Sequence, residues 1–136
     1  EINEKVNSLS AIIKDLKMEC TMNVIVKNDN SNTIQRTISS LLSSEGFAVQ
    51  KEKAPYQVLV ECIWDVVVAK DSYGETFTSY PGIEVVIQNS GNAIFSYSKT
   101  CGKTVAFDRN KNVVMSYQKL EKELNSTFVK EFNLAF

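Results

Sequence analysis

The sequence contains no histidine among its 136 residues. Imidazole is the general base of Ser-His and Cys-His catalytic pairs and the commonest metal ligand, so its absence excludes sites of those kinds. Paired carboxylates remain possible in principle, but Glu61 and Asp65 on one strand face would stand roughly 13 Å apart, beyond the usual catalytic separations. We therefore expect a protein that is not an enzyme and that holds no cofactor and no metal.

Cysteine and glycine are both scarce. The three cysteines, Cys20, Cys62 and Cys101, are widely spaced and odd in number, which fits neither a disulfide scaffold nor a Cys-x-x-Cys zinc site. Cys62 alternates with apolar neighbours and is expected to be a small core residue. Cys20 and Cys101 lie near element ends and could pair if the first strand lies beside the last ones. None of the five glycines forms a phosphate-binding loop before a helix, so we expect no nucleotide site.

The chain also lacks a charge excess and a long apolar run. Its formal net charge is -1, which gives little long-range attraction to nucleic acid or to anionic lipid. No apolar stretch approaches the roughly 20 residues that a transmembrane helix needs. The sequence starts at Glu1 instead of methionine, so we expect a processed or trimmed chain whose targeting segment or lipid anchor would lie upstream.

Residues 1–18 carry an apolar stripe at heptad spacing and are predicted to form an amphipathic helix. So much aliphatic surface is expected to meet a second surface, either the sheet of the same chain or a neighbouring molecule. The heptad period favours helix-on-helix contact, including self-association into a homo-oligomer. The stripe consists of Ile2, Val6, Leu9, Ile13 and Leu16.

Residues 19–136 are predicted to form a single α+β domain with an antiparallel-rich sheet and helices packed on one face. Asn32 and Gln35 resemble a capping box at the start of a helix that Gly46 ends, and Asp108 is expected to cap a long final helix. That helix should bury Val113, Tyr117, Leu120, Leu124, Phe128 and Phe132. The predicted strands are 20–27, 47–50, 56–69, 76–88 with a break at Pro81-Gly82, 93–99 and 104–107.

The long strand 56–69 has two different faces. Its apolar face contains Trp64, which should belong to the core. The opposite face mixes polar and aliphatic side chains and is expected to be half covered by a helix or by a partner. At the hairpin tip that follows, Tyr73, Phe77 and Tyr80 are candidates for a partner-binding surface, because exposed tyrosines suit contact with proteins, although they could also fold back on their own sheet. The apolar face of this strand consists of Tyr56, Val58, Val60, Cys62, Trp64, Val66 and Val68.

The order of elements from residue 20 to residue 132 resembles a group of small bacterial envelope lipoprotein domains. The segments that carry the resemblance are "SSEGF", "YQVLVECIWDVVV" and "GNAIFSYSKTCGK". The group includes lipopolysaccharide-assembly lipoproteins, the amino-terminal domain of the TolB type, and curli-secretion and penicillin-binding-protein-activator lipoproteins. The resemblance implies a non-enzymatic scaffold that binds another envelope protein or component, in the periplasm or at the outer membrane, with membrane contact only through an upstream lipid anchor. The alternative is a secreted or cytosolic protein–protein interaction domain.

Overall fold

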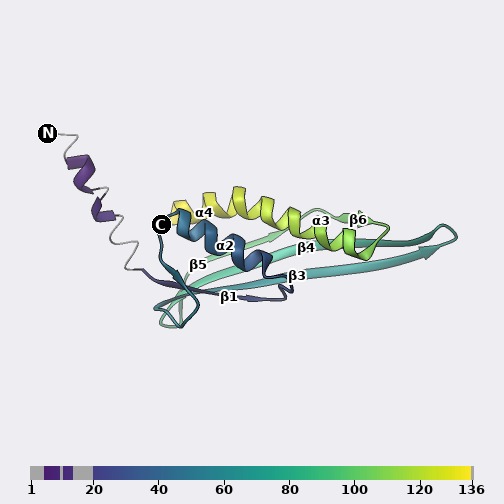
Figure 1. The fold of residues 1–136 in the computed structure, drawn as a ribbon, viewed down its shortest axis with the longest axis horizontal. Coiled ribbons are helices and arrows are strands. Elements are labelled where there is room, and N and C mark those ends of the chain that lie inside the picture. The colour runs from purple at the N-terminus through teal and green to yellow at the C-terminus, as the bar shows by residue number, and fades with distance from the viewer. Residues whose placement is uncertain (1–4, 10, 14–19, 136) are drawn as a thin grey trace.

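The computed structural model describes residues 5–9, 11–13 and 20–135. Residues 20–135 form a mixed six-stranded sheet with helices packed against it (Figure 1), which confirms the predicted α+β class. The strands are β1 (Met22–Lys27), β2 (Val49–Gln50), β3 (Tyr56–Asp71), β4 (Gly74–Asn89), β5 (Asn92–Thr100) and β6 (Thr104–Ala106). The helices are α2 (Thr33–Ser44), α3 (Arg109–Glu123), the π-helical turn η1 (Leu124–Phe128) and α4 (Val129–Ala135).

The strand order is β2-β1-β3-β4-β5, with β6 pairing to β4. Strand β1 runs parallel to β2 and β3, because α2 intervenes before the chain returns to the sheet, and the other pairs are antiparallel. The β3–β4 hairpin turns at Ser72 and Tyr73 and projects beyond the helices (Figure 1). Gly74 follows this turn with φ 125°, a conformation that glycine adopts without steric cost.

The core lies between the sheet and the helical segments α2, α3, η1 and α4, which cover one face of the sheet (Figure 1). Alternate strand residues point into it, as the period of two requires. The other face, expected to be half covered, has no helix over it among the described residues, and its Ile25 and Val67 are 43% and 58% exposed. The largest fully buried side chains are Phe128, Phe132, Met22, Ile34, Ile38, Leu42, Ile83, Ile87, Leu120, Leu124, Val58 and Val85.

Helix α2 begins differently from the predicted capping box. Asn32 has a left-handed φ of 57° and its side chain caps nothing; instead, the Asp29 carboxylate accepts a hydrogen bond from the Gln35 N–H at 2.9 Å. The prediction that Asn32 caps this helix was therefore wrong. The first turn is capped by the Asp29 carboxylate instead, which accepts a hydrogen bond from a backbone N–H group of that turn. The predicted stop is confirmed, because Gly46 has φ 97° and its N–H donates to the Ser43 carbonyl.

Pro81 does not interrupt β4, contrary to the prediction. Its carbonyl accepts the Cys101 N–H at 2.8 Å, and the amide side of a residue in an antiparallel strand faces the same neighbour as its carbonyl. The pairing of β4 with β5 ends at Gly82–Thr100, and its pairing with β6 begins at Ser79–Thr104. The Pro81 nitrogen therefore faces the gap between these two strands. A proline is tolerated here because no ladder bond is lost.

The final helix is capped as predicted, since the Asp108 carboxylate accepts the Asn110 N–H at 2.9 Å. The buried face of this helix differs from the predicted one in its first turns. Val113 is 44% exposed there, and Asn112 and Ser116 are buried instead. In a regular α-helix a row of every fourth residue drifts around the axis, because 3.6 residues make one turn. The wider π turn η1 offsets this drift. The buried row is Asn112, Ser116, Leu120, Leu124, Phe128 and Phe132.

Candidate functional site

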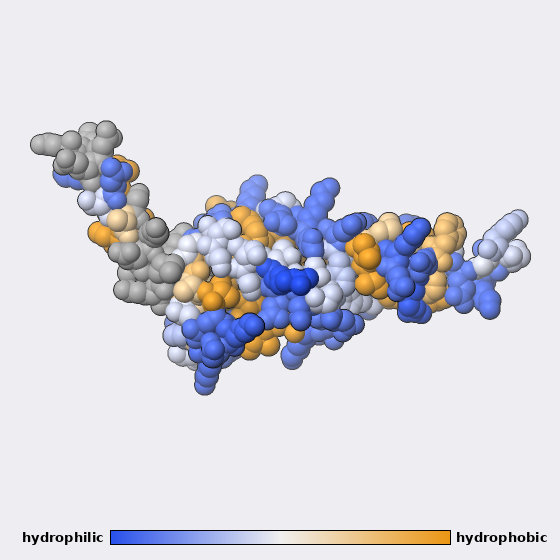
Figure 2. Space-filling view, in the orientation of Figure 1, coloured by the Kyte–Doolittle hydropathy of each residue, from blue (hydrophilic) through white to orange (hydrophobic). Residues whose placement is uncertain are grey.

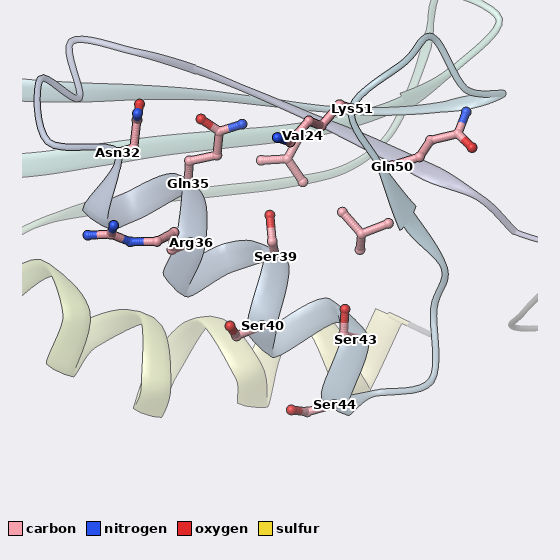
Figure 3. A pocket seen from close by; sticks show the side chains of 11 residues that line it. Val24, Asn32, Gln35, Arg36, Ser39, Ser40, Ser43, Ser44, Gln50 and Lys51 are labelled. Atoms are coloured by element: carbon pink, nitrogen blue, oxygen red, sulfur yellow. The ribbon is translucent and has the colours of Figure 1, made fainter.

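A groove of about 720 Å³ lies between α2 and the edge of the sheet (Figure 3). It exists because β2 pairs with β1 only at Met22 and Asn23, so that among the described strands none covers β1 from Val24 onward. We call it the α2–β1 groove. Its lining residues are Val24, Asn32, Gln35, Arg36, Ser39, Ser40, Ser43, Ser44, Val49, Gln50 and Lys51.

The polar wall of this groove follows from the sequence of α2. Ile34, Ile38 and Leu42 recur every fourth residue and are fully buried. The residues immediately after them, Gln35, Ser39 and Ser43, lie one step of about 100° around the helix and form a parallel polar strip. Figure 3 shows this strip on the side of α2 that faces the strands, whereas Ser40 and Ser44 point away.

The opposite wall is fixed by a buried side chain on β1. The Asn23 amide, 6% exposed, donates to the Lys51 carbonyl at 3.0 Å and to the Gln50 carbonyl at 3.4 Å. The Gln50 amide in turn donates to the Lys53 carbonyl at 2.9 Å. These bonds hold the chain after β2 in place and keep Lys51 at the rim.

The chemistry of the α2–β1 groove is that of a polar binding surface. Its lining supplies hydroxyls, side-chain amides and the cations of Arg36 and Lys51, and none of the lining residues is acidic. Such groups hydrogen-bond to hydroxyl and amide groups and form charge-assisted bonds to carboxylates or phosphates. Sequence reasoning missed this site, because serine and glutamine at helical spacing also describe any solvated helix face. The only available signal was that the polar strip lies directly beside the buried one.

A second, smaller cavity of about 170 Å³ lies between α3 and the inner face of β3. Its floor is polar, because the buried Ser79 and Ser116 hydroxyls are hydrogen-bonded at 2.7 Å. Trp64 forms one side, where it packs against Tyr117 with ring centroids 4.6 Å apart and donates its indole N–H to the Asn28 carbonyl at 2.6 Å. Trp64 thus lies at the rim of the core, partly buried, instead of at its centre.

The three predicted tip aromatics are not brought together. Tyr73 is 98% exposed at the turn and Tyr80 is 44% exposed. Phe77 is 7% exposed, under the Arg109 guanidinium, which lies 5.0 Å from the ring centroid. Odd and even residues of β4 face opposite sides of the sheet, so Phe77 points toward α3 and Tyr80 away from it. Partner contact therefore stays a prediction for Tyr73 and Tyr80, and Phe77 is placed as a core residue.

The amino-terminal stripe is described in part. Residues 5–9 and 11–13 are helical, and Val6, Leu9 and Ile13 are 54%, 59% and 53% exposed. Ile2 and Leu16 lie outside the described residues. Figure 1 shows the described helical residues away from the sheet, so contact with a neighbouring molecule stays a prediction.

All three cysteines are free. Cys20 precedes β1, whereas Cys101 follows β5 on the far side of β3 and β4, so the sheet order does not bring the two thiols together as a pair. Burial raises the pKa of the Cys62 thiol to about 12, and burial also raises the pKa of Cys101. Both thiols are therefore protonated and poorly nucleophilic at neutral pH.

Within the described parts of the chain, no group of three or more cysteine or acidic side chains is placed to hold a metal ion. The helices described there are also too short or too polar to cross a membrane.

No protein-family model and no curated protein matches the sequence. Solved structures do match the fold. A minor lipoprotein from Acinetobacter baumannii has a TM-score of 0.54 at 12% identity, over 82% of this chain and 89% of that one. A putative lipoprotein from Caulobacter crescentus has a TM-score of 0.50 at 9% identity, over 92% and 94%. A Xanthomonas campestris protein of the DUF330 family has a TM-score of 0.50 at 10% identity, over 84% and 81%. The chain thus has the fold of small bacterial lipoproteins.

Proposed function

We propose that this chain is a non-enzymatic binding or assembly module of the bacterial cell envelope, and that it binds its partner in the α2–β1 groove. The observation that carries the binding role is the groove itself, which combines a strip of hydroxyl and amide groups with the cations of Arg36 and Lys51. The envelope assignment is supported by the fold shared with lipoproteins of Acinetobacter and Caulobacter.

The groove chemistry favours an anionic glycan as the ligand. Hydroxyls and side-chain amides pair with sugar hydroxyls and acetamido groups, while Arg36 and Lys51 suit a carboxylate or a phosphate. Two envelope components carry these groups: peptidoglycan has carboxylates and lipopolysaccharide has phosphates on its inner sugars. The resemblance to lipopolysaccharide-assembly, TolB-type and penicillin-binding-protein-activator lipoproteins is consistent with either source.

The binding test is a titration of the ¹⁵N-labelled protein with soluble peptidoglycan fragments in one series and with delipidated lipopolysaccharide core in another. We expect shifts of the Gln35, Ser39 and Ser43 amides in one of the two series. The double variant Arg36→Ala/Lys51→Ala should lose affinity by about tenfold or more, because two charge-assisted bonds are removed. Lys111→Ala/Lys122→Ala removes the same charge from exposed positions on α3 and should bind normally. Equal losses in both double variants, or no shift in the groove with either ligand, would refute this binding site.

Cell fractionation separates the envelope assignment from the alternative of a secreted or cytosolic interaction domain. We expect the natural protein, detected with an antibody, in the membrane or periplasmic fraction. Recovery from the cytosol or from the culture medium would favour the alternative.

The non-enzymatic part of the proposal is tested by generic esterase, phosphatase and glycosidase substrates. We expect no turnover above buffer. Turnover that one substitution among the groove serines abolishes would overturn it.

A further inference from the structure

The cavity between α3 and β3 has a buried polar floor and an apolar mouth. Ser79, Asn112 and Ser116 form the floor and are at most 2% exposed. Val66 and Val113 also line the cavity, but both are exposed, so they mark its mouth. Figure 2 shows hydrophobic residues at the surface where the hairpin leaves the helices. A ligand would therefore reach the floor by passing between apolar side chains.

The three floor side chains have no hydrogen left to donate. Asn112 gives its two amide hydrogens to the Phe77 and Thr104 carbonyls. The Ser116 hydroxyl donates to the Asn112 backbone carbonyl at 2.8 Å, so Ser79 is the donor in the 2.7 Å bond between the two serine hydroxyls. Because a hydroxyl carries one hydrogen and a primary amide two, the floor offers only oxygen lone pairs. A group that binds there must be a hydrogen-bond donor.

The side wall of the cavity suits a positive charge. It contains the aromatic rings of Trp64 and Tyr117. The indole N–H of Trp64 is already donated to the Asn28 carbonyl, so the ring itself is what Trp64 contributes. Aromatic rings attract cations through their negative faces. None of the lining residues is charged, so no lysine or arginine of the lining competes for this place.

A carboxylate lies beside this wall. Asp29 directly precedes the lining residue Asn30, and its Oδ1 atom is buried without a hydrogen-bond partner among the described residues. Burial is the main reason that the pKa of Tyr117 is raised, and the negative charge of Asp29 raises it further. The field of Asp29 therefore reaches the cavity wall and favours a cationic ligand.

The size of the cavity limits the ligand. Its volume is about 170 Å³. A water molecule occupies about 30 Å³ in the liquid, so the cavity has room for about five non-hydrogen atoms. An ammonium group on a short alkyl chain combines three donors, a positive charge and an apolar tail that matches Val66 and Val113. A carboxylate of the same size brings only acceptors and does not match the floor.

We propose that this cavity binds a small primary amine in its ammonium form. The ammonium hydrogens bond to the side-chain oxygens of Ser79, Asn112 and Ser116. The charge lies beside the rings of Trp64 and Tyr117, and the alkyl chain points to the mouth. The site shares no lining residue with the α2–β1 groove, so it is a second ligand site whose failure would leave the proposed function standing.

Trp64 is the only tryptophan of the chain, so its fluorescence reports on the cavity directly. We expect n-butylammonium chloride, at neutral pH and constant ionic strength, to change the emission with a Kd on the order of 1 mM, as suits a ligand of this size. Tetramethylammonium has the charge without N–H groups, and butyrate has only acceptors. Both should bind at least about tenfold more weakly. Equal binding of either compound, or no saturation with n-butylammonium up to about 100 mM, would overturn the proposal.

Two variants test the floor and the wall separately. Ser79→Ala removes a floor acceptor and should weaken n-butylammonium binding by about tenfold. Tyr117→Leu should have a similar effect, because it removes a ring and keeps an apolar side chain. Ser98→Ala makes the serine change at an exposed position of β5 and should bind normally. Thermal unfolding identifies the variants that are folded. Unchanged affinity in either folded cavity variant, or an equal loss in Ser98→Ala, would reject this site.

Discussion

Asn112 shows how a polar residue can be part of the core. It is 2% exposed, and its amide donates to the Phe77 carbonyl at 3.0 Å and to the Thr104 carbonyl at 2.9 Å. One side chain thus holds the start of α3 against both β4 and β6. The cost of burying the amide is offset because both of its donors are satisfied.

Asn112→Ala should lower the free energy of unfolding by about 2 kcal/mol, since two buried carbonyls lose their donor. Urea denaturation measures the change. Val113→Ala, one residue along and 44% exposed, should change stability by less than about 0.5 kcal/mol. Similar values for the two variants would contradict the role given to Asn112.

Cys62 and Cys101 provide a pH-dependent prediction. The folded-state pKa of Cys62 is about 12, against an ordinary value of 9.0, so folding favours the protonated thiol. The stability that this preference contributes is present below pH 9 and is lost as the pH rises from about 9 toward 12. At pH 8 we expect iodoacetamide to modify Cys20, which is partly exposed, well before Cys62 and Cys101. Mass spectrometry of the peptides checks the order; rapid modification of Cys62 in the folded protein would refute it.

The π turn η1 acts at the scale of an element. It contains Leu124 to Phe128 and allows Phe128 and Phe132 to remain on the buried row that begins at Asn112. The aromatic cluster depends on it, because Phe128 contacts the Tyr97 ring at 5.4 Å and Phe132 contacts the Phe47 ring at 5.5 Å between centroids. A π turn of this kind is equivalent to one extra residue in an α-helix.

Deleting the exposed Ser126 should therefore be tolerated. After the deletion, Phe128 follows Leu124 by three residues instead of four. Residues three apart also lie on the same face of a regular α-helix. Deleting Gln118, exposed within the regular part of α3, rotates all later residues by about 100° and should be far more destabilising. Thermal unfolding compares the two deletions, and a larger loss for Ser126 would show that η1 has another role.

At the scale of the whole molecule, the described amino-terminal residues and the hairpin tip lie at opposite ends (Figure 1). The apolar side chains of the described amino-terminal residues are more than half exposed. Deleting residues 1–18 should leave the melting temperature of the domain unchanged, because the described part of the stripe does not pack on the sheet, and should reduce the mass of any assembly that the stripe supports. Light scattering with thermal unfolding measures both. A destabilised monomer would instead mean that the stripe packs on its own domain.

Sequence patterns predicted most of the elements, because β3 and β5 alternate with period two and α2 and α3 carry clear apolar rows. These patterns failed where tertiary contacts determine which side chains are buried. Asn112 and Ser116 were missed because polar residues are expected outside the core. Phe77 was grouped with Tyr73 and Tyr80 because all three lie near the hairpin tip in the sequence, whereas the alternation of β4 turns the Phe77 ring toward α3. The α2–β1 groove could not be predicted, since it depends on β2 being only two residues long.

The β3–β4 hairpin also has a consequence for the order of folding. Its residues pair across a two-residue turn, so the ladder can close step by step from Asp71 and Gly74. Each residue of β1 instead pairs with one 34 positions later, as Met22 does with Tyr56, and must close a long loop first. We expect the hairpin to form before the transition state and β1 to dock after it. Val24→Ala should therefore accelerate unfolding and leave the refolding rate nearly unchanged, whereas Val85→Ala should slow refolding in stopped-flow measurements.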